Sequence, residues 1–385
     1  MKNDYLCRKI DNVKNIPFLL ILLILFSCSG SGGSKTGNIV NDNDSIAEQK
    51  VTPVKLEPLK DETLRLKGRD PFGEIIELKG EQIVNDSLIF KPREVEIVIK
   101  DNFMVMKNHS RDGLFILFSL PELRLIKTFG SIGPGPDEFM VPSLCGNTQP
   151  DILATVLELS NGKVYDVLHE GALRINEKYM PRQNRTMHGS EYPALMTDSL
   201  LYFTANSSTG KSVFTLGGTA DSIQINEIQN LALDPKRKAW ANYIGDFAVN
   251  IEQNRMVYAY KYFKVVKFFD MENHTVRTVN FERGEFDEST IYKVDGLDAN
   301  VTHYWGICSC EKHVYMLYSG RTPAQVWRDN NREDYYIYVE KYDWNGNPTS
   351  KYKLDRWGYF TVDEKNNLLY LVSTNDDDPF FRYKL

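Results

Sequence analysis

The chain has 385 residues, of which 42% are hydrophobic and 25% charged, and its 52 acidic against 46 basic side chains give a net charge of −6. A nucleic-acid-binding surface needs a basic stripe that neutralises phosphates, so this acidic balance excludes nucleic acid as the expected partner. The length suits one large all-β domain better than two smaller domains.

The first 27 residues predict a lipoprotein signal peptide. Basic side chains between Lys2 and Lys14 precede the apolar run Phe18–Phe26, which is too short to span a membrane comfortably. The segment Leu25-Phe26-Ser27-Cys28 resembles the bacterial lipobox, whose cysteine is lipidated and becomes the mature N-terminus. We therefore expect Cys28 to anchor the protein to a membrane through lipid. The alternative is an uncleaved N-terminal anchor helix.

Residues 28–52 predict a flexible tether. They are mostly Ser, Gly, Asn, Asp and Lys, and such a segment cannot bury enough apolar surface to offset the entropy lost on ordering. In lipoproteins of Bacteroidetes, acidic residues directly after the lipidated cysteine resemble a surface-export signal, and residues 29–34 carry none. This favours a cell-envelope protein that faces the periplasm from the outer membrane.

Four short apolar runs recur behind polar turns, and each contains a tyrosine at an equivalent place. These tyrosines are spaced by 55 to 57 residues: Tyr202, Tyr258, Tyr315 and Tyr370. Self-similarity near this period is typical of repeat architectures, and a four-stranded propeller blade is a unit of that size. A sandwich or a barrel also contains many short strands but does not repeat in this way. The repeat therefore predicts a β-propeller.

The pattern predicts six blades within one all-β domain, residues 53–385, with almost no helix. Tyr, Phe, Val and Ile dominate runs of four to eight residues, and Asp-Gly, Asn-Gly and Pro turns separate these runs. The expected blades are residues 93–130, 148–180, 192–230, 243–283, 299–354 and 356–385. Because the last blade is short, we expect an N-terminal strand within Ile75–Phe90 to complete it. Such a strand closes the ring and removes open sheet edges.

A segment rich in glycine and proline follows the first predicted blade. It contains Gly130, Gly133, Gly135, Pro136 and Glu138. It is not a phosphate-binding loop, since no Gly-Lys-Ser/Thr follows, and it does not open a helix as a dinucleotide-binding loop does. Such residues favour a rigid, sharply turning crossover into the next blade, with Glu138 capping the backbone. Direct contact with a ligand is the alternative.

The same segment, Phe129–Phe139, resembles a loop of TolB-like six-bladed β-propeller lipoproteins of Bacteroidetes, near the BF3164-like lipoprotein group. With the lipobox and the repeat, the whole chain past residue 70 is similar to that group. The resemblance implies a cell-envelope propeller. It carries over no catalytic residues, because the group offers no established set.

Two groups of side chains suggest a metal site. Asp376, Asp377 and Asp378 form the densest acidic cluster of the folded part, and carboxylates suit a hard cation such as Ca²⁺. A solvated turn is the alternative there, because the EF-hand pattern is absent. Cys308 and Cys310, with histidines nearby, form the second group. We favour a buried core strand over a metal at that place, since no second ligand pair follows, and a disulfide between the two would be strained.

An enzymatic alternative places a divalent cation in the central channel, as propeller hydrolases and lyases do. Glu158, Asn206, Asp246 and Asp363 fall near strands of different predicted blades and could converge on such an ion. Serine chemistry is not indicated, because no Gly-x-Ser-x-Gly elbow occurs and the six histidines stand in no triad context. We therefore expect no catalysis and no cofactor, and keep the cation-dependent hydrolase or lyase as the alternative.

Recognition of a partner is the function that the remaining side chains favour. Four tryptophans could stack on sugar rings or peptides at a propeller face: Trp240, Trp305, Trp327 and Trp357. The alternative, packing between blades, is favoured for Trp357, which lies in a strand pattern, and is weaker for Trp327. The polar insertion Gly320–Asp334 carries Arg321, Trp327 and Arg328, and Trp and Arg are over-represented at binding hot spots. These three residues are the predicted contact surface of a non-catalytic binding or scaffold module for a peptide, a glycan or another envelope protein.

Overall fold

The computed structural model describes residues 56–67, 70–85, 88, 90–135, 138–176, 192–208, 210–219, 222–234, 243–281 and 300–385. They belong to one compact unit that runs from Thr52 to Leu385. The predicted signal peptide, Cys28 and nearly all of the predicted tether precede this unit and lie outside the described residues. Within the described ranges, no helix has the length and apolar character needed to cross a membrane.

In these ranges the chain forms 27 strands in five sheets and one short helix, α1 (Pro323–Asn330). In order across the first sheet, the strands are β4 (Ile97–Lys100), β5 (Phe103–Lys107), β6 (Asp112–Ser119), β7 (Arg124–Ile132) and β8 (Glu138–Phe139). Those of the second are β12 (Leu173–Ile175), β11 (Lys163–Leu168), β10 (Ile152–Glu158), β9 (Pro142–Asn147), β13 (Tyr192–Met196), β14 (Leu200–Ser207), β15 (Gly210–Thr219) and β16 (Ser222–Asn230). Those of the third are β1 (Glu62–Arg65), β20 (Thr275–Asn280), β19 (Val265–Asp270), β18 (Arg255–Tyr260) and β17 (Gly245–Asn250). Those of the fourth are β2 (Ile75–Leu78), β24 (Pro348–Leu354), β23 (Ile337–Asp343), β22 (His313–Arg321) and β21 (Thr302–Ser309). Those of the fifth are β25 (Gly358–Asp363), β26 (Leu368–Ser373), β27 (Phe380–Lys384) and β3 (Glu81–Ile83).

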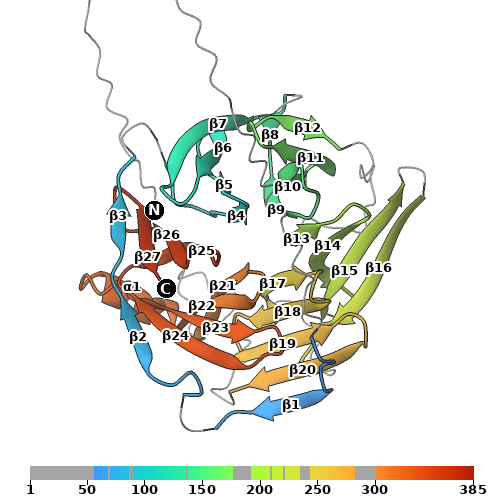
Figure 1. Ribbon diagram of the computed structural model, residues 1–385, viewed down its shortest axis with the longest axis vertical. Helices are drawn as coiled ribbons and strands as arrows, with labels where there is room; N and C mark the ends of the chain where they lie inside the picture. The colour runs from blue at the N-terminus through green and yellow to red at the C-terminus, as the bar shows by residue number, and fades with distance from the viewer. Residues whose placement is uncertain are drawn as a thin grey trace, which may run out of the picture. The chain divides into compact units, whose positions relative to one another are not determined.

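The sheets fan out around a common centre, with β4, β9, β13, β17, β21 and β25 innermost (Figure 1). From each of these strands an antiparallel meander leads outward, which defines six strand groups: β4–β7, β9–β12, β13–β16, β17–β20, β21–β24 and β25–β27. Hydrophobic clusters fill the space between neighbouring groups. One cluster joins the last group to the first, where Tyr370 and Phe380 pack with Met104 and Ile116. The architecture is nearly all-β and propeller-like.

The second group differs from its predicted blade. The prediction begins that blade at residue 148, but the innermost strand is β9. The sequence does not indicate β9, because it contains Pro and Gly, which are uncommon in strands. β9 pairs in parallel with β13, so that Leu195 lies opposite Gly146 and two groups share one eight-stranded sheet. Glycine permits this close approach, because a Cβ on Gly146 would lie only 3.2 Å from Leu195 Cδ1.

The tyrosines of the repeat share one position, the second strand of their group: Tyr202 on β14, Tyr258 on β18, Tyr315 on β22 and Tyr370 on β26. Two of their hydroxyls reach a neighbouring group. The Tyr315 hydroxyl donates to the Glu364 carboxylate at 3.2 Å, and the Tyr370 hydroxyl donates to the Pro121 carbonyl at 2.8 Å. A ring that packs in the interior and a hydroxyl that bonds across the contact explain why these two positions carry tyrosine.

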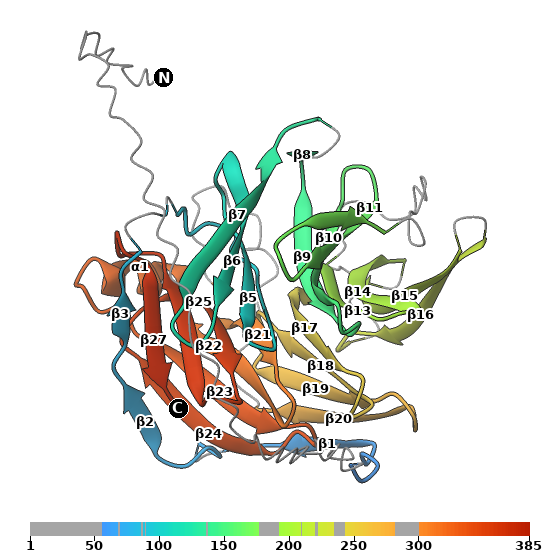
Figure 2. The ribbon, with the colours of Figure 1, turned by 45° about the horizontal axis from the view of Figure 1, so that its top comes forward.

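The N-terminal part of the unit runs along the outer edges of three sheets (Figures 1 and 2). β1 pairs in parallel with β20, β2 pairs in parallel with β24, and β3 pairs antiparallel with β27. β3 lies within the segment that the sequence analysis expects to complete the last blade. We call residues 56–83 the N-terminal strap. It covers strand edges that would otherwise present unpaired backbone groups.

A buried ionic cluster joins the strap to two sheets. Glu340 on β23 is fully buried, and its Oε1 atom pairs with Lys264 Nζ at 3.0 Å and with Lys351 Nζ at 3.2 Å. Lys351 Nζ also pairs with the carboxylate of Asp70 in the strap, at 3.0 Å. Two hydroxyls donate to Glu340 Oε2 at 3.0 Å, those of Tyr304 and Tyr342. The several partners offset the cost of removing these charges from water.

Candidate binding face

One end of the sheets gathers side chains of the kind that bind ligands. In an antiparallel meander, the start of the first strand and the connection from the second to the third strand lie at the same end. Seven residues at this end form a set that we call the cation–aromatic strip. Four of them lie at or near the start of β13, β17, β21 or β25: Tyr192, Asp246, Trp305 and Trp357. The other three lie at the β14–β15, β18–β19 and β22–β23 connections: Lys211, Lys261 and Arg321.

The strip is continuous across neighbouring strand groups. Lys211 Nζ lies 5.0 Å from the centre of the Tyr192 ring, and Lys261 Nζ lies 4.8 Å from the centre of the Trp305 ring. Trp305 in turn meets Trp357 edge to face, with ring centres 5.8 Å apart. Rings and cations therefore come from four consecutive groups, β13–β16 to β25–β27; the Lys261–Trp305 and Trp305–Trp357 contacts cross two of the boundaries, and the Lys211–Tyr192 contact lies within one group.

Asp246 supplies a negative charge beside the two lysines of the strip. Burial raises the pKa of Asp246 to about 6, while the charges of Lys261 and Lys211 act in the opposite direction. The carboxyl therefore takes up a proton as the pH falls through about 6. Protonation leaves both lysine charges without this counter-charge, so that the strip is more strongly cationic in mild acid.

Large apolar side chains are exposed at this end of the sheets. Tyr192 and Trp327 are each 62% exposed, Met140 is 57% exposed and Trp305 is 39% exposed. Met140 comes two residues before β9 and so lies at the same end of its sheet as the strip. Apolar surface of this kind, next to fixed cations, is typical of interaction sites.

The predicted polar insertion forms the helix α1, which the sequence analysis does not foresee. Thr322 begins it with a capping box: its hydroxyl accepts from the Gln325 N–H at 3.2 Å, and the Gln325 side chain accepts from the Thr322 N–H at 2.8 Å. Pro323 occupies the first turn, where no partner for its nitrogen is needed. The helix leaves Trp327 and Arg328 exposed.

Arg321, the third residue of the predicted contact surface, is buried. Its guanidinium pairs with Asp329 of α1 at 2.8 Å and donates to the Tyr336 carbonyl, and it lies 3.8 Å from the centre of the Tyr336 ring. It also lies 5.5 Å from the centre of the Trp357 ring. These contacts contradict the expectation of an exposed arginine. Arg321 holds α1 beside the strip, because its charge is satisfied by the helix and its plane packs on aromatic rings.

The glycine-rich segment forms hydrogen bonds within itself and with the end of β7. β8 pairs in parallel with the end of β7, and the Gly135 N–H donates to the Glu138 carboxylate at 2.8 Å. A Cβ on Gly133 would lie 2.1 Å from that carboxylate, and Gly130 has φ = +69°, so neither position tolerates a side chain. Pro136 lies outside the described residues. This geometry is that of a crossover turn with Glu138 as its cap.

The three aspartates considered as calcium ligands do not form a ligand set. Asp376 accepts from the Ser373 hydroxyl at 2.5 Å and pairs with Arg356 at 3.3 Å. Asp377 and Asp378 are exposed, and the Asp378 carbonyl accepts from a glutamine of the strap at 2.9 Å. Across the ranges that the structure describes, no group of three or more His, Cys, Asp or Glu side chains could hold a metal ion. The cluster is therefore a turn that contacts the strap.

Of the four polar residues expected to meet at a central channel, Glu158, Asn206 and Asp246 lie at the end of the sheets that carries the strip, and Asp363 does not. Glu158 accepts from two backbone N–H groups of the connection before β9, at 2.9 and 3.0 Å. Asp363 accepts from the β25–β26 turn, at the opposite end of its sheet from the strip. Asn206 lies near the end of β14. Of the four, only Asp246 belongs to the strip.

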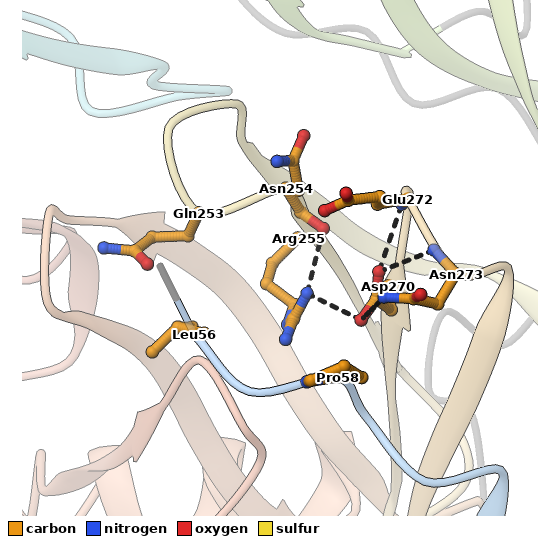
Figure 3. A pocket seen from close by; sticks show the side chains of 8 residues that line it. All are labelled: Leu56, Pro58, Gln253, Asn254, Arg255, Asp270, Glu272 and Asn273. Atoms are coloured by element: carbon orange, nitrogen blue, oxygen red, sulfur yellow. Dashed lines mark hydrogen bonds and ion pairs between the residues drawn. The ribbon is translucent and has the colours of Figure 1, made fainter. Parts of the chain in front are cut away.

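A small pocket of about 90 Å³ lies where the strap begins. Arg255 and Asp270 line it and pair with each other at 2.9 Å (Figure 3). Asp270 also accepts from the Leu59 N–H at 3.1 Å, and Arg255 donates to the Glu57 carbonyl at 2.6 Å. Small-molecule sites usually enclose about 300–1,000 Å³. The pocket is therefore a docking point for the strap.

Sequence reasoning identifies part of this binding face. Trp305 of the strip is among its stacking candidates, and Asp246 is among its candidate cation ligands; Trp357 is assigned there to packing between blades. It misses the exposed tyrosine and both lysines: Tyr192, Lys211 and Lys261. Alignment of the repeat by strand position could have found them, because each lies where a group starts or where its second strand turns back. Trp240 lies outside the described residues.

No protein-family model and no curated protein matches the chain. A solved structure of a DUF4221 family member from Bacteroides vulgatus is 11% identical, with 80% of this chain and 95% of that chain covered and a TM-score of 0.52. A protein from Bacteroides fragilis whose name marks it as exported is 11% identical, with coverages of 84% and 99% and a TM-score of 0.51. A streptogramin B lyase, at 12% identity, coverages of 80% and 97% and a TM-score of 0.42, is too distant to inform the function. The likeness to the two Bacteroides proteins establishes a common fold alone.

Proposed function

We propose that the chain is a six-bladed β-propeller, anchored in the cell envelope by lipid on Cys28, that binds a partner with its cation–aromatic strip. The six strand groups and the hydrophobic clusters between them support the blade count. The β3–β27 pairing supports closure of the ring by an N-terminal strand. The lipobox and the tether, residues 28–52, support a periplasm-facing lipoprotein, as does the exported Bacteroides fragilis protein with this fold. The resemblance of the glycine-rich segment to TolB-like lipoproteins favours the same assignment.

The strip favours an extended acidic glycan as the ligand. The exposed rings of Tyr192 and Trp305 offer flat apolar surfaces on which sugar rings stack, and Lys261 beside Trp305 supplies a positive charge for a carboxylate. The contacts run over four strand groups, which suits a polymer better than a small molecule that needs an enclosed pocket. The pairing of the exposed rings of Tyr192 and Trp305 with the partly exposed Lys261 is the observation that carries this proposal; Lys211 and Arg321 are buried.

Polysaccharide binding tests the strip directly. Affinity electrophoresis in gels that contain polygalacturonate, dextran or polyglutamate compares an acidic glycan, a neutral glycan and an acidic peptide. We expect polygalacturonate to retard the protein most. Tyr192→Ala and Trp305→Ala should each weaken binding by about tenfold or more, as removal of an aromatic hot spot does. Ile126→Ala on β7, also an exposed apolar side chain at 46%, is the matched control.

Three results decide against the glycan. Unchanged retardation of both aromatic variants removes the strip as the site. Stronger retardation by polyglutamate identifies an acidic peptide as the partner. Retardation by dextran that equals the polygalacturonate effect removes the role of charge. Trp327→Ala and Arg328→Ala test separately whether α1 extends the surface; pull-down of a partner that survives both confines binding to the strip.

The proposed role is non-catalytic, and the second candidate, a hydrolase or lyase with a divalent cation in the central channel, is tested by metal. The carboxylates that could serve such an ion hold backbone turns instead, as Glu158 and Asp363 do. Thermal unfolding with EDTA and with Ca²⁺ should give the same midpoint if the protein is a binding module. A stabilisation by Ca²⁺ that Asp246→Asn abolishes would favour the enzyme.

The anchor has its own test. Replacing Cys28 with alanine should move the protein from the membrane fraction to the soluble fraction, because lipid is its only proposed attachment. Retention of Cys28→Ala in the membrane fraction would instead favour the uncleaved N-terminal helix.

A further inference from the structure

Two cysteines meet where the strand group β21–β24 contacts β25. Cys308 lies near the end of β21, and Cys310 comes directly after the strand's last residue. Both are free thiols and partly exposed, and their Sγ atoms lie 3.9 Å apart. Cys308 Sγ also lies 3.6 Å from Thr361 Oγ1 on β25. The pair is therefore within reach of a small reagent and within reach of each other.

The two thiols have different surroundings. The Val362 N–H donates to Cys308 Sγ at 3.3 Å, whereas the Cys310 thiol donates to the Val362 carbonyl at 3.6 Å. When Cys308 is a thiolate, the Cys310 S–H can turn from the Val362 carbonyl to the Cys308 sulfur, 3.9 Å away. That hydrogen bond, with those from Thr361 and Val362, outweighs burial and lowers the pKa of Cys308, and the same contact raises the pKa of Cys310. Cys308 is therefore the thiol that more readily forms a nucleophilic thiolate.

The backbone at Cys310 can adjust to a bridge. A disulfide has an S–S distance of about 2.05 Å, so the sulfur atoms have to approach by about 2 Å from their present separation. The Cys310 N–H donates to the His313 carbonyl at 3.0 Å, within a turn rather than a strand ladder. Residues two apart on an extended strand lie at the upper limit of the Cα separation for disulfides. The bridge is strained, and strained bridges are the readily reduced ones.

We propose that Cys308 and Cys310 form a redox-active dithiol site that reacts with hydroperoxides. The Cys308 thiolate attacks one oxygen of hydrogen peroxide, the O–O bond breaks, and the departing hydroxide takes up a proton to become water. The sulfenic acid on Cys308 is then attacked by the Cys310 sulfur, the S–O bond breaks, and the hydroxyl leaves with the Cys310 proton as a second water. The two thiols lose two electrons, and the peroxide gains them.

Oxidation alters the contact between two strand groups. Cys310 loses the proton that it donates to the Val362 carbonyl, and the Cys308 sulfur moves toward Cys310 and away from the Val362 N–H. β21 also carries Trp305 of the cation–aromatic strip. The dithiol thus lies on the strand that connects this contact to the binding face.

Peptide mass spectrometry tests the reaction. The reduced, purified protein is treated with one equivalent of hydrogen peroxide and then alkylated. We expect a Cys308–Cys310 disulfide and an alkylated Cys145 only after unfolding, because Cys145 is buried and burial raises its pKa. In Cys310→Ser, dimedone should trap a sulfenic acid on Cys308. In Cys308→Ser, dimedone should label neither Cys145 nor Cys310.

The opposite results overturn the proposal. Absence of the bridge in the wild-type protein does so, and so does a dimedone adduct on Cys310 in Cys308→Ser. A serine hydroxyl can still accept from the Val362 N–H, so we expect both variants to fold, and circular dichroism melting checks this. In the folded protein Cys308 should be alkylated faster than Cys310, because its thiolate forms more readily. If this preference persists in urea, the fold does not cause it and the structural basis fails.

Discussion

The two halves of the propeller-like unit protect their outer sheet edges by different means. From β17 to β27, the strap adds a strand to each sheet. From β4 to β16, no strap strand does so within the described residues; β12 has three residues and β16 is rich in polar side chains. Short and polar edges are common ways to prevent edge-to-edge association. One half is thus protected by the chain's own N-terminal segment and the other by its local sequence.

One ion pair from each half shows a second difference. In the strapped half, Glu340 holds Lys264 and Lys351 with no solvent contact of its own. In the other half, Glu96 pairs with Lys107 at 2.6 Å, but its side chain is still 31% exposed. A buried charge needs several partners, and the strapped half provides them because three chain segments meet there. The comparison teaches that the strap stabilises the interior as well as the edge.

Glu340→Ala should lower the free energy of unfolding more than any other change considered. It leaves two lysines buried without their carboxylate, and removing one side of a buried pair costs about 3–5 kcal/mol in the free energy of unfolding. Glu96→Ala in the other half should cost only about 1–2 kcal/mol, because Lys107 can turn to water. Urea unfolding followed by tryptophan fluorescence measures both. Equal losses would show that burial under the strap adds nothing.

Asp270→Ala should release the start of the strap. Asp270 binds Arg255 and the Leu59 N–H, and we expect a loss of about 2–3 kcal/mol, because Arg255 at the small pocket can regain water. Limited proteolysis should then cut the strap within residues 56–67 while the sheets resist. Asp343→Ala is the control, since Asp343 holds a similar turn through the Asn345 N–H at 3.0 Å. Faster strap cleavage in the control would contradict this role.

Asp246→Asn should change how the stability of the protein depends on pH. Burial raises the pKa of Asp246 to about 6, above that of an unfolded aspartate. A raised carboxyl pKa means that the folded state gains stability as the pH falls through about 6 and loses it as the pH rises. The asparagine variant, neutral throughout, should be more stable than wild type at pH 7.5 and about equal to it near pH 3, below the pKa of an unfolded aspartate. Thermal melting at both values measures the difference, and parallel curves would refute a buried titrating Asp246.

Lys353→Ala should have the smallest effect. Lys353 pairs with Glu77 of the strap at 3.1 Å, but Glu77 is 76% exposed, and exposed pairs contribute about 0–1 kcal/mol. Lys351, two residues earlier on the same strand, is 6% exposed and binds Glu340. Lys351→Ala should therefore cost several times more in urea unfolding. Similar losses for the two lysines would mean that strand position, and not burial, sets their contribution.

The sequence predicts the repeated part of the fold because local signals recur. Tyrosines mark the second strands, and aspartates after third strands mark the turns. Asp270 and Asp343 accept backbone N–H groups of the turns that follow them. A short strand-forming run with a turn on each side needs no distant partner to be recognised. The strand groups are therefore largely visible in the chain itself.

The strap and the strip are less predictable for physical reasons. Glu340, Lys264 and Lys351 are residue types that usually lie on surfaces, and only the meeting of distant segments buries them. β1 and β2 are short strands with exposed side chains, and their partners lie some 200 to 280 residues away in the chain. Lys211 and Lys261 stand next to aromatic rings only after neighbouring groups have packed. The helix α1 depends on the capping box at Thr322, a signal confined to four residues.

The pairing of β3 with β27 also constrains the order of folding during biosynthesis. Arg382 near the C-terminus binds Glu81 near the start of the unit, 301 residues earlier. A ribosome finishes the earlier residue long before the later one, so the strap strands wait without their partners while the intervening chain is made. Contacts over such long sequence separations slow folding and leave strand edges open in the interim. The protein therefore depends on folding conditions that keep its first strands apart from other chains until its last strand has arrived.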